Sequence, residues 1–400
     1  MSKKILLAFV VLSAVLLMAG STVFAQEEFV FGLVLVGPEN DRGWSQAHYE
    51  GGQYVEANVP GARMIFFPSL NPADAPETTL LDVVTEMVDQ GAQLIITTSD
   101  AFEEDTDTVA EAFPDIPFVN VSGDNSLTGE APPNVGNVMG QMEWGKLIAG
   151  CAAGLATQTG SIGYLGPLIN GETRRLAASA YLGARYCYET YNANAETTDL
   201  TFTVTWIGFW FNIPGVTLDP TEEANRFFDG GSDVVLSGID TPNAIEVAGQ
   251  RAANGEAVFA IPYDYVASCD IAPEVCLGVP YFHWGPIYAD LARAVIAGEW
   301  EPSWDWVGPD WTDLNNPDTS AIGFISGAGL TDEQSAILDG FIADLAEYAT
   351  NPFVPSSFAL WQGPLNLQDG TELAAAGQLV DPLDVWYLPQ LLEGMVGASE

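Results

Sequence analysis

The sequence is poor in positive charge. It holds 11 lysines and arginines against 54 aspartates and glutamates, which gives a formal net charge of −43 at pH 7. A field of that sign repels nucleic acids and anionic lipid surfaces, so neither is expected as a partner. It favours solubility or a high-salt habitat, and it does not decide the fold.

The sequence also lacks the motifs of common enzymes and metal sites. Its two histidines stand in neither an H-E-x-x-H nor an H-x-E pattern, and no G-x-S-x-G segment is present. The acidic run 103–107 lacks the glycine and glutamate spacing of an EF-hand loop. We therefore expect no catalytic residue, no metal site and no cofactor. Hydrolysis by paired carboxylates stays open as an alternative, because so many carboxylates are available.

Long apolar runs are confined to the first 25 residues. Two lysines precede the apolar run 5–19, and a small-x-small cleavage site ends at Ala25. This pattern predicts an export signal over 1–25, which places the mature chain in a periplasm or at the outer face of the cytoplasmic membrane. No later run approaches the length of about 20 apolar residues that spans a bilayer. Ser21 stands where a lipobox would carry cysteine, so no lipid anchor is expected.

Cysteine is scarce, with four residues that allow three pairings. An exported chain meets an oxidising compartment, so Cys269 and Cys276, separated by a short proline-bearing turn, are expected to form a local disulfide. By elimination Cys151 would pair with Cys187 and link two helices. The alternative is that these last two are buried free thiols.

The mature chain alternates β-rich runs with helical patterns, as doubly wound parallel α/β sheets do. Its length of about 375 residues exceeds one ordinary core, so two domains are expected. One series runs from the apolar strand 29–36, through a helix over 77–90, to a strand over 134–138. A second series starts with a helix over 143–156. The sequence therefore predicts two α/β lobes.

The stretch from Gly37 to Gly51 carries chemistry that a plain connection does not need. It follows the first strand, at the carboxyl end where open α/β sheets bind ligands. Its polar and aromatic residues include Asn40, Asp41, Trp44 and Ser45. These side chains are candidate ligand contacts. The alternative is that Trp44 is a hydrophobic staple and that Asn40 and Asp41 cap the helix.

An internal echo links the two series. The segment 89–96 (DQGAQLII) resembles 229–236 (DGGSDVVL), and the same offset sets Asp100 opposite Asp240. Each lobe thus presents an aspartate just beyond the carboxyl end of a strand. Either these aspartates cap helices in a duplicated architecture, or the two lobes face each other across a ligand cleft.

Several segments together resemble the basic membrane protein family, which comprises substrate-binding proteins of ABC importers and includes purine nucleoside receptors. The segments are GPENDRGWSQAHYEG (37–51), MVDQGAQLIITTS (87–99), GQMEWGKLIAG (140–150), GSIGYLG (160–166), PYFHWGPIYAD (280–290) and WQGPLNLQDG (361–370). The resemblance implies a type I periplasmic-binding-protein fold with two doubly wound parallel-sheet lobes and a hinge. Lobe 1 would span 26–140 with a return segment over 265–326. Lobe 2 would span 141–264 with the C-terminal segments 327–400.

The resemblance also implies roles for individual residues. Trp44 and its opposite-lobe partner Trp210 match aromatic residues that stack on a base, which stabilises binding by about 1–3 kcal/mol. Asn40 and Asp41 match residues that contact the base, and Asp264 matches an aspartate that holds ribose hydroxyls. The remaining implied pocket residues are Asp100, Phe102 and Asp240.

The implied function is capture of a small planar ligand, a purine nucleoside or related base, for a membrane permease. A monomer is expected. A ligand-sensing subunit of a signalling system is the alternative, and a nucleoside hydrolase is the least favoured.

The sequence departs from the family pattern at three places. Ser45 stands where the nucleoside receptors have asparagine, and the segment 277–284 lacks their lysine. His283 occupies that neighbourhood, either as a hinge histidine or as a ligand contact. The loop 269–276 and the Trp-rich segment 300–311 are expected to reshape the entrance of the cleft.

Overall fold

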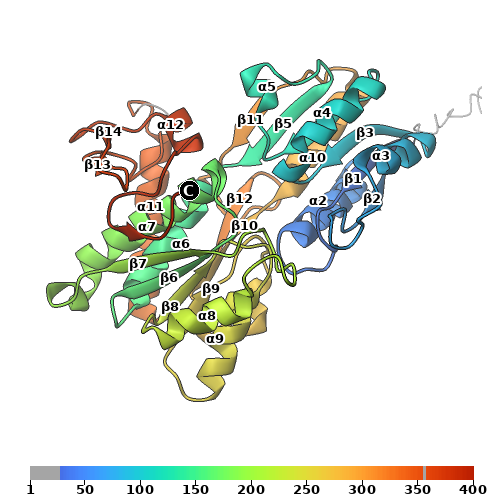
Figure 1. Cartoon of the computed structure of the whole chain (residues 1–400). Helices are drawn as coiled ribbons and strands as arrows, with labels where there is room; N and C mark the ends of the chain where they lie inside the picture. Colours follow the sequence, from blue (N-terminus) through green and yellow to red (C-terminus); the bar gives the residue numbers. More distant parts are fainter. Residues whose placement is uncertain (1–27, 355–356) are drawn as a thin grey trace, which may run out of the picture.

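The computed structural model describes residues 28–354 and 357–400, which form two α/β lobes side by side (Figure 1). The predicted export signal lies outside the described residues. Within them, no helix is long and apolar enough to cross a membrane.

Lobe 1 is built on a six-stranded parallel sheet with the strand order β11-β5-β4-β3-β1-β2. Its strands are β1 (Phe29–Val34), β2 (Ala62–Phe67), β3 (Ala92–Thr97), β4 (Phe118–Val121), β5 (Val135–Gly140) and β11 (Trp304–Val307). Its helices are α2 (Trp44–Asn58), α3 (Leu80–Asp89), the 3-10 turn η1 (Asp100–Phe102), α4 (Glu103–Ala112), α5 (Asn125–Thr128) and α10 (Trp284–Ala297). All six residues of β1 are buried, as the continuous apolar run predicted for a central parallel strand.

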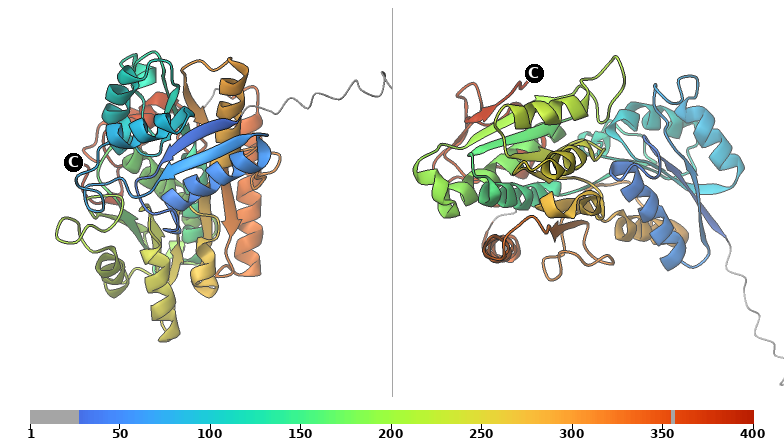
Figure 2. Two further views of the ribbon diagram at one scale, coloured as in Figure 1. Left: turned by 90° about the vertical axis from the view of Figure 1, so that its right-hand side faces the viewer. Right: turned by 90° about the horizontal axis from the view of Figure 1, so that it is seen from below.

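Lobe 2 is built on a five-stranded parallel sheet with the order β15-β7-β6-β8-β9. Its strands are β6 (Ser161–Gly166), β7 (Thr201–Trp206), β8 (Val234–Ser237), β9 (Phe259–Ile261) and β15 (Met395–Val396). Its larger helices are α6 (Met142–Ala156), α7 (Gly171–Tyr191), α8 (Pro220–Asp229), α9 (Asn243–Ala253) and α11 (Asp332–Thr350). The end of the chain adds β13 (Leu365–Asn366), β14 (Glu372–Ala374) and α12 (Pro382–Trp386) beside this lobe (Figure 2).

The lobes are joined by chain segments that cross between them. The antiparallel pair β10 (Gly278–Phe282) and β12 (Ile322–Ser326) lies in the middle of the molecule (Figure 1). The short turns η3 (Ser268–Ile271) and η4 (Pro273–Val275) lead into β10, and η2 (Ala193–Glu196) follows α7. The α/β two-lobe fold expected from the sequence is therefore the observed one.

Some predicted element boundaries are wrong by a few residues. The helix predicted from position 77 begins at Leu80, because Thr79 forms a capping box with Asp82 and so fixes the start of α3. The first strand ends at Val34, two residues before the end of its apolar run.

Both predicted disulfides, Cys151–Cys187 and Cys269–Cys276, are present. The first joins α6 to α7, whose backbones approach closely because glycines such as Gly150 face the partner helix.

Candidate functional site

A small cavity of about 10 Å³, room for about one water molecule, lies between the lobes. Its lining residues are Trp44, Ser99, Asp100, Ser122, Glu172, Trp210, Asp240 and Tyr263. Each of them follows the carboxyl end of a parallel strand, namely β1, β3, β4, β6, β7, β8 or β9. The two sheets therefore point their ligand-binding edges at one another, as open α/β folds predict.

On the lobe 1 side, the β1–α2 loop places Trp44 at the wall of the cavity. The Trp44 indole is 7% exposed, and its Nε1 donates to the carbonyl oxygen of Thr98 at 2.6 Å. Its ring packs edge-on against Phe282 and Trp284. These contacts fix the position of the indole.

Asp41 anchors that loop. Its carboxylate accepts hydrogen bonds from the backbone N–H groups of Gly43, Ser45 and Gln46 at 2.9 to 3.0 Å. The carboxylate therefore caps α2, which is the second of the two roles that the sequence suggested for Asp41. The Ser45 hydroxyl accepts from the backbone N–H of Gly37 and closes the loop.

On the lobe 2 side, Trp210 lies in the β7–α8 loop and is 8% exposed. Its carbonyl oxygen accepts a hydrogen bond from the backbone N–H of Asp240 at 3.0 Å, and this bond links the two cavity residues. The Asp240 carbonyl in turn lies against the backbone of Gly43 in lobe 1, where any β-carbon would overlap with it. The lobes thus touch directly beside the cavity.

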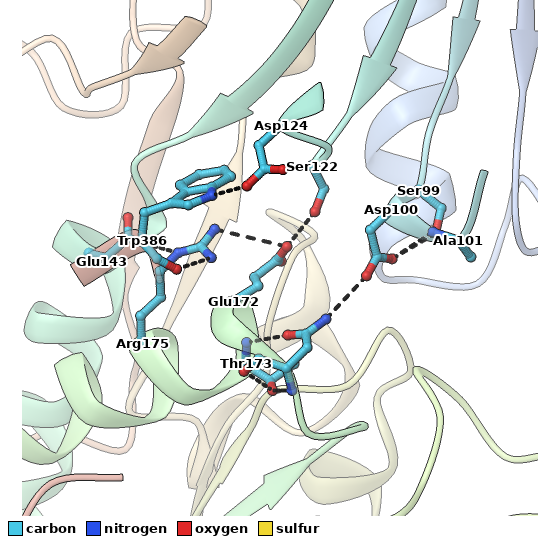
Figure 3. A network of polar contacts seen from close by, with 11 residues as sticks. Ser99, Asp100, Ala101, Ser122, Asp124, Glu143, Glu172, Thr173, Arg175 and Trp386 are labelled. Carbon is cyan, nitrogen blue, oxygen red and sulfur yellow. Dashed lines mark hydrogen bonds and ion pairs between the residues drawn. The ribbon is translucent and has the colours of Figure 1, made fainter. Parts of the chain in front are cut away.

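Polar contacts between the lobes continue along one side of the cavity (Figure 3). The side-chain amide of Asn170 donates to Asp100 at 3.1 Å, and the Ser122 hydroxyl donates to the carboxylate of Glu172. The indole of Trp386 donates to Asp124 at 2.8 Å. Because each bond joins the two lobes, the network exists only while the lobes are close together.

Asp264 and Lys146 form a buried polar centre next to the cavity. Asp264 is fully buried, and neither carboxylate oxygen has a hydrogen-bond partner among the described residues. The Lys146 ammonium donates to the carbonyl oxygen of Ser237 at 2.7 Å and lies 3.3 Å from the ring centroid of Tyr263. Asp264 also has a φ of 70°, a left-handed value that is uncommon for residues other than glycine.

Burial governs the titration of these groups. Desolvation raises the pKa of Asp41 to about 6 and that of Glu172 to about 7. Burial likewise raises the pKa of Asp240 and of Asp264 well above its usual range, and neighbouring carboxylates add to the shift. Burial lowers the pKa of Lys146 to about 7, against the opposing pull of Asp264. The site is therefore a dense carboxylate cluster with little solvent.

Six predicted contact residues are not among those that line the cavity: Asp41 and Asp264, described above, and four others. Asn40 is exposed, and Ser45 is fully buried under the first loop. Phe102 lines a separate hollow between α3 and α4. His283 bonds through Nδ1 to the carbonyl oxygen of Ser320 at 3.0 Å and lines a different surface hollow. These contacts favour the interpretation of His283 as a hinge residue over its interpretation as a ligand contact.

Sequence reasoning missed several residues that line the cavity, above all Ser122, Glu172 and Tyr263. Their position in the sequence could have indicated them, because each follows a predicted strand. The sequence does not show which strand ends meet across the cleft. The described residues contain no group of three or more His, Cys, Asp or Glu arranged to hold a metal.

Comparisons with known proteins agree with this geometry. A family model described as "ABC transporter substrate-binding protein PnrA-like" matches residues 29–258. A purine-binding protein of Brucella abortus (strain 2308) is 26% identical over 374 residues, which cover 91% of this chain and 92% of that protein. A putative ABC transporter glucose-binding protein of Haloferax volcanii is 28% identical over 276 residues, which cover 69% of this chain and 63% of that protein.

Solved structures support the fold at lower identity. An ABC transporter solute-binding protein from Conexibacter woesei gives a TM-score of 0.57 at 20% identity, covering 82% of this chain and 99% of that one. One from Aeropyrum pernix gives 0.57 at 16% identity, covering 82% of each chain. Because the family model spans more than half of the chain, this protein belongs to the PnrA-like family of ABC transporter substrate-binding proteins.

Proposed function

We propose that the protein is the receptor of an ABC importer and captures a purine nucleoside or related base by closing its lobes around it. The observation that carries the proposal is that one cavity has an indole from each lobe, Trp44 and Trp210, in its wall. The purine-binding relative from Brucella abortus supports the ligand class.

Stacking explains how such a cavity could serve a planar ligand. A base–aromatic stack contributes about 1–3 kcal/mol and tolerates different bases, because every base has a π-face. The carboxylates of Asp100 and Asp240 would accept hydrogen bonds from amino and hydroxyl donors at the ligand edge. Asp264, buried and without a partner, would accept from ribose hydroxyls once the ligand is seated.

Closure would follow from contacts shared between the lobes. Neither lobe alone offers both indoles, so a ligand binds the closed arrangement better and shifts the population toward it. We take the moving bodies to be residues 26–140 with 265–326, and 141–264 with 327–400. The closed monomer would present a surface to the permease outside the cytoplasm, where the binding proteins of ABC importers work.

The proposal is tested by identifying what the protein holds. Mass spectrometry of molecules released by denaturing the freshly purified protein should find a nucleoside or base. Titration calorimetry with adenosine, guanosine, inosine, adenine, thiamine and glucose then ranks the classes. Glucose binding without nucleoside binding would overturn the proposal, and released free base after incubation with a nucleoside would indicate a hydrolase.

A substitution at Asp264 tests more directly whether the ligand carries a ribose. An Asp264→Asn change keeps the shape and tolerates the positive φ, since asparagine adopts that region readily. It should weaken nucleosides more than free bases, because a missing acceptor matters only to ligands that carry the hydroxyl. Asp270→Asn, an exposed carboxylate, is the matched control. Equal losses for adenosine and adenine would remove the ribose role from Asp264.

A further inference from the structure

The carboxyl groups in and beside the interlobe cavity outnumber the cationic side chains that act on them. We propose that its preferred ligand is a planar molecule carrying a positive charge, and that this charge distinguishes it from neutral molecules of the same shape. The inference rests on the proposed function and narrows its ligand class.

Two carboxyl groups beside the cavity lack hydrogen-bond donors among the described residues. Asp240 lines the cavity, is only 4% exposed and has just its backbone engaged. Asp264 is completely buried, with both oxygens unpaired. Buried polar groups are almost always satisfied, and an unsatisfied carboxylate costs more than a neutral group. A bound ligand could therefore supply hydrogen-bond donors to these two groups.

Three further carboxyl groups belong to the same cluster. Asp100 and Glu172 line the same cavity, and Asp41 lies close enough to act electrostatically on Asp240 and Asp264. Their existing bonds come mainly from neutral groups: backbone N–H, the Ser99 and Ser122 hydroxyls and the Asn170 amide. Such bonds orient the carboxyl groups and supply no positive charge.

Two cations act on this cluster, and both are already engaged. Arg175 forms an ion pair with Glu143 at 2.7 Å and lies 4.0 Å from Glu172. Lys146 donates to a backbone carbonyl and acts electrostatically on Asp264. His48 is fully buried, its Nδ1 is bonded to the Tyr288 hydroxyl, and burial lowers its pKa well below the usual range, so it adds no charge.

Counting these groups gives six carboxylates, including Glu143, against two cations. Charges in a dry cleft must be compensated by protons or by opposite charge, since water screening is lost. A ligand cation would take the place of those protons, and it would add donor hydrogens as well. Phosphorylated or carboxylated molecules would meet repulsion from the same groups and should bind weakly.

Two matched ligand pairs isolate the charge. 1-Methyladenosine is a cation near neutral pH, whereas 1-methylinosine is neutral and has nearly the same shape. Adenosine and inosine differ by the same amino-for-oxo exchange without a charge. We expect the affinity ratio of the methylated pair to exceed that of the unmethylated pair by tenfold or more, on the order of one partly screened charge contact. Calorimetry at pH 6.5 measures all four.

The variant Asp240→Asn removes one unpaired charge and keeps the backbone bond to Trp210. It should reduce the cation preference severalfold, while Asp270→Asn should leave it unchanged. If the nucleosides bind but the two ratios are equal, or if Asp240→Asn leaves the preference intact, the charge inference is wrong and the proposed function stands. If none of the four ligands binds, both the proposed function and this inference fail.

Discussion

At the scale of single residues, Trp210 is the best place to test stacking. Trp44 also supports its own lobe, through its bond to Thr98 and its packing on Phe282, whereas Trp210 lies in a loop outside the sheets. Trp210→Ala should weaken the natural ligand by about 5- to 160-fold, because one stacking face contributes about 1–3 kcal/mol. Phe209→Ala, in the same loop but outside the cavity wall, is the calorimetric control. Unchanged affinity in the Trp210 variant would remove stacking from the mechanism.

Glu172 makes stability depend on pH. Burial raises its pKa from 4.5 to about 7 in the folded chain, so the folded state holds this proton more tightly than the unfolded state does. The stabilisation is complete below pH 4.5 and is lost as the pH rises through about 7. The melting temperature should therefore fall between pH 5 and 8, and Glu172→Gln should flatten that fall. Glu372→Gln, at an exposed position, should keep the wild-type slope; a parallel slope in the Glu172 variant would refute the assignment.

The sequence predicted cavity residues where a pattern marked them. The repeated segments placed Asp100 opposite Asp240, and both line the cavity. Glu172 and Tyr263 carried no such mark, because a buried glutamate and a strand-end tyrosine look ordinary until the opposing lobe is placed. Asn40 shows the reverse case: a polar loop residue matches the family motif, yet its side chain is exposed and does not line the cavity.

At the scale of elements, the two disulfides should differ in their contributions. Cys151 and Cys187 are 36 residues apart, whereas Cys269 and Cys276 are 7 apart. The loss of loop-closure entropy in the unfolded chain then gives about 4 kcal/mol for the first and about 2 kcal/mol for the second. Replacing each pair with alanines and measuring chemical unfolding tests the order. A larger loss from the short loop would show that native packing, not chain entropy, sets the effect.

Helices and strands were predicted correctly where the hydrophobic periodicity is strong. They were missed where pairing with a neighbouring strand decides the structure. The apolar runs of the central strands and the glycine-terminated helices were visible in the sequence. The Trp-rich segment 300–311 supplies β11, an edge strand parallel to β5 that was not predicted. Strands of two residues, such as β13 and β15, exist only because a neighbouring strand pairs with them, so no local pattern reveals them.

At the scale of the whole molecule, the two-lobe architecture was predictable and the approach of the lobes was not. Each lobe has its own sheet and core, which follow from hydrophobic pattern. The contacts between the lobes beside the cavity are specific, and they include the Asn170–Asp100 bond, the Ser122–Glu172 bond and the packing of Gly43 on Asp240. Small changes there should alter closure while leaving both lobes folded.

Gly43 allows the strongest test of closure. A β-carbon at this position would overlap with the carbonyl oxygen of Asp240 in the opposite lobe, so Gly43→Ala should hold the lobes apart. Overpacking of this kind typically costs about 1–3 kcal/mol, which corresponds to a 5- to 160-fold loss of ligand affinity. Small-angle X-ray scattering should show a smaller ligand-induced decrease in the radius of gyration than in the wild type.

Gly340→Ala is the control for that substitution, since a β-carbon at position 340 in α11 meets no atom within 4 Å. Circular dichroism of the free Gly43 variant would verify that α2, which begins at the next residue, still forms. If Gly43→Ala binds ligand as tightly as the wild type and compacts to the same radius, the contact with Asp240 does not belong to the ligand-bound state. Closure would then have to bring the lobes together along a different line of approach.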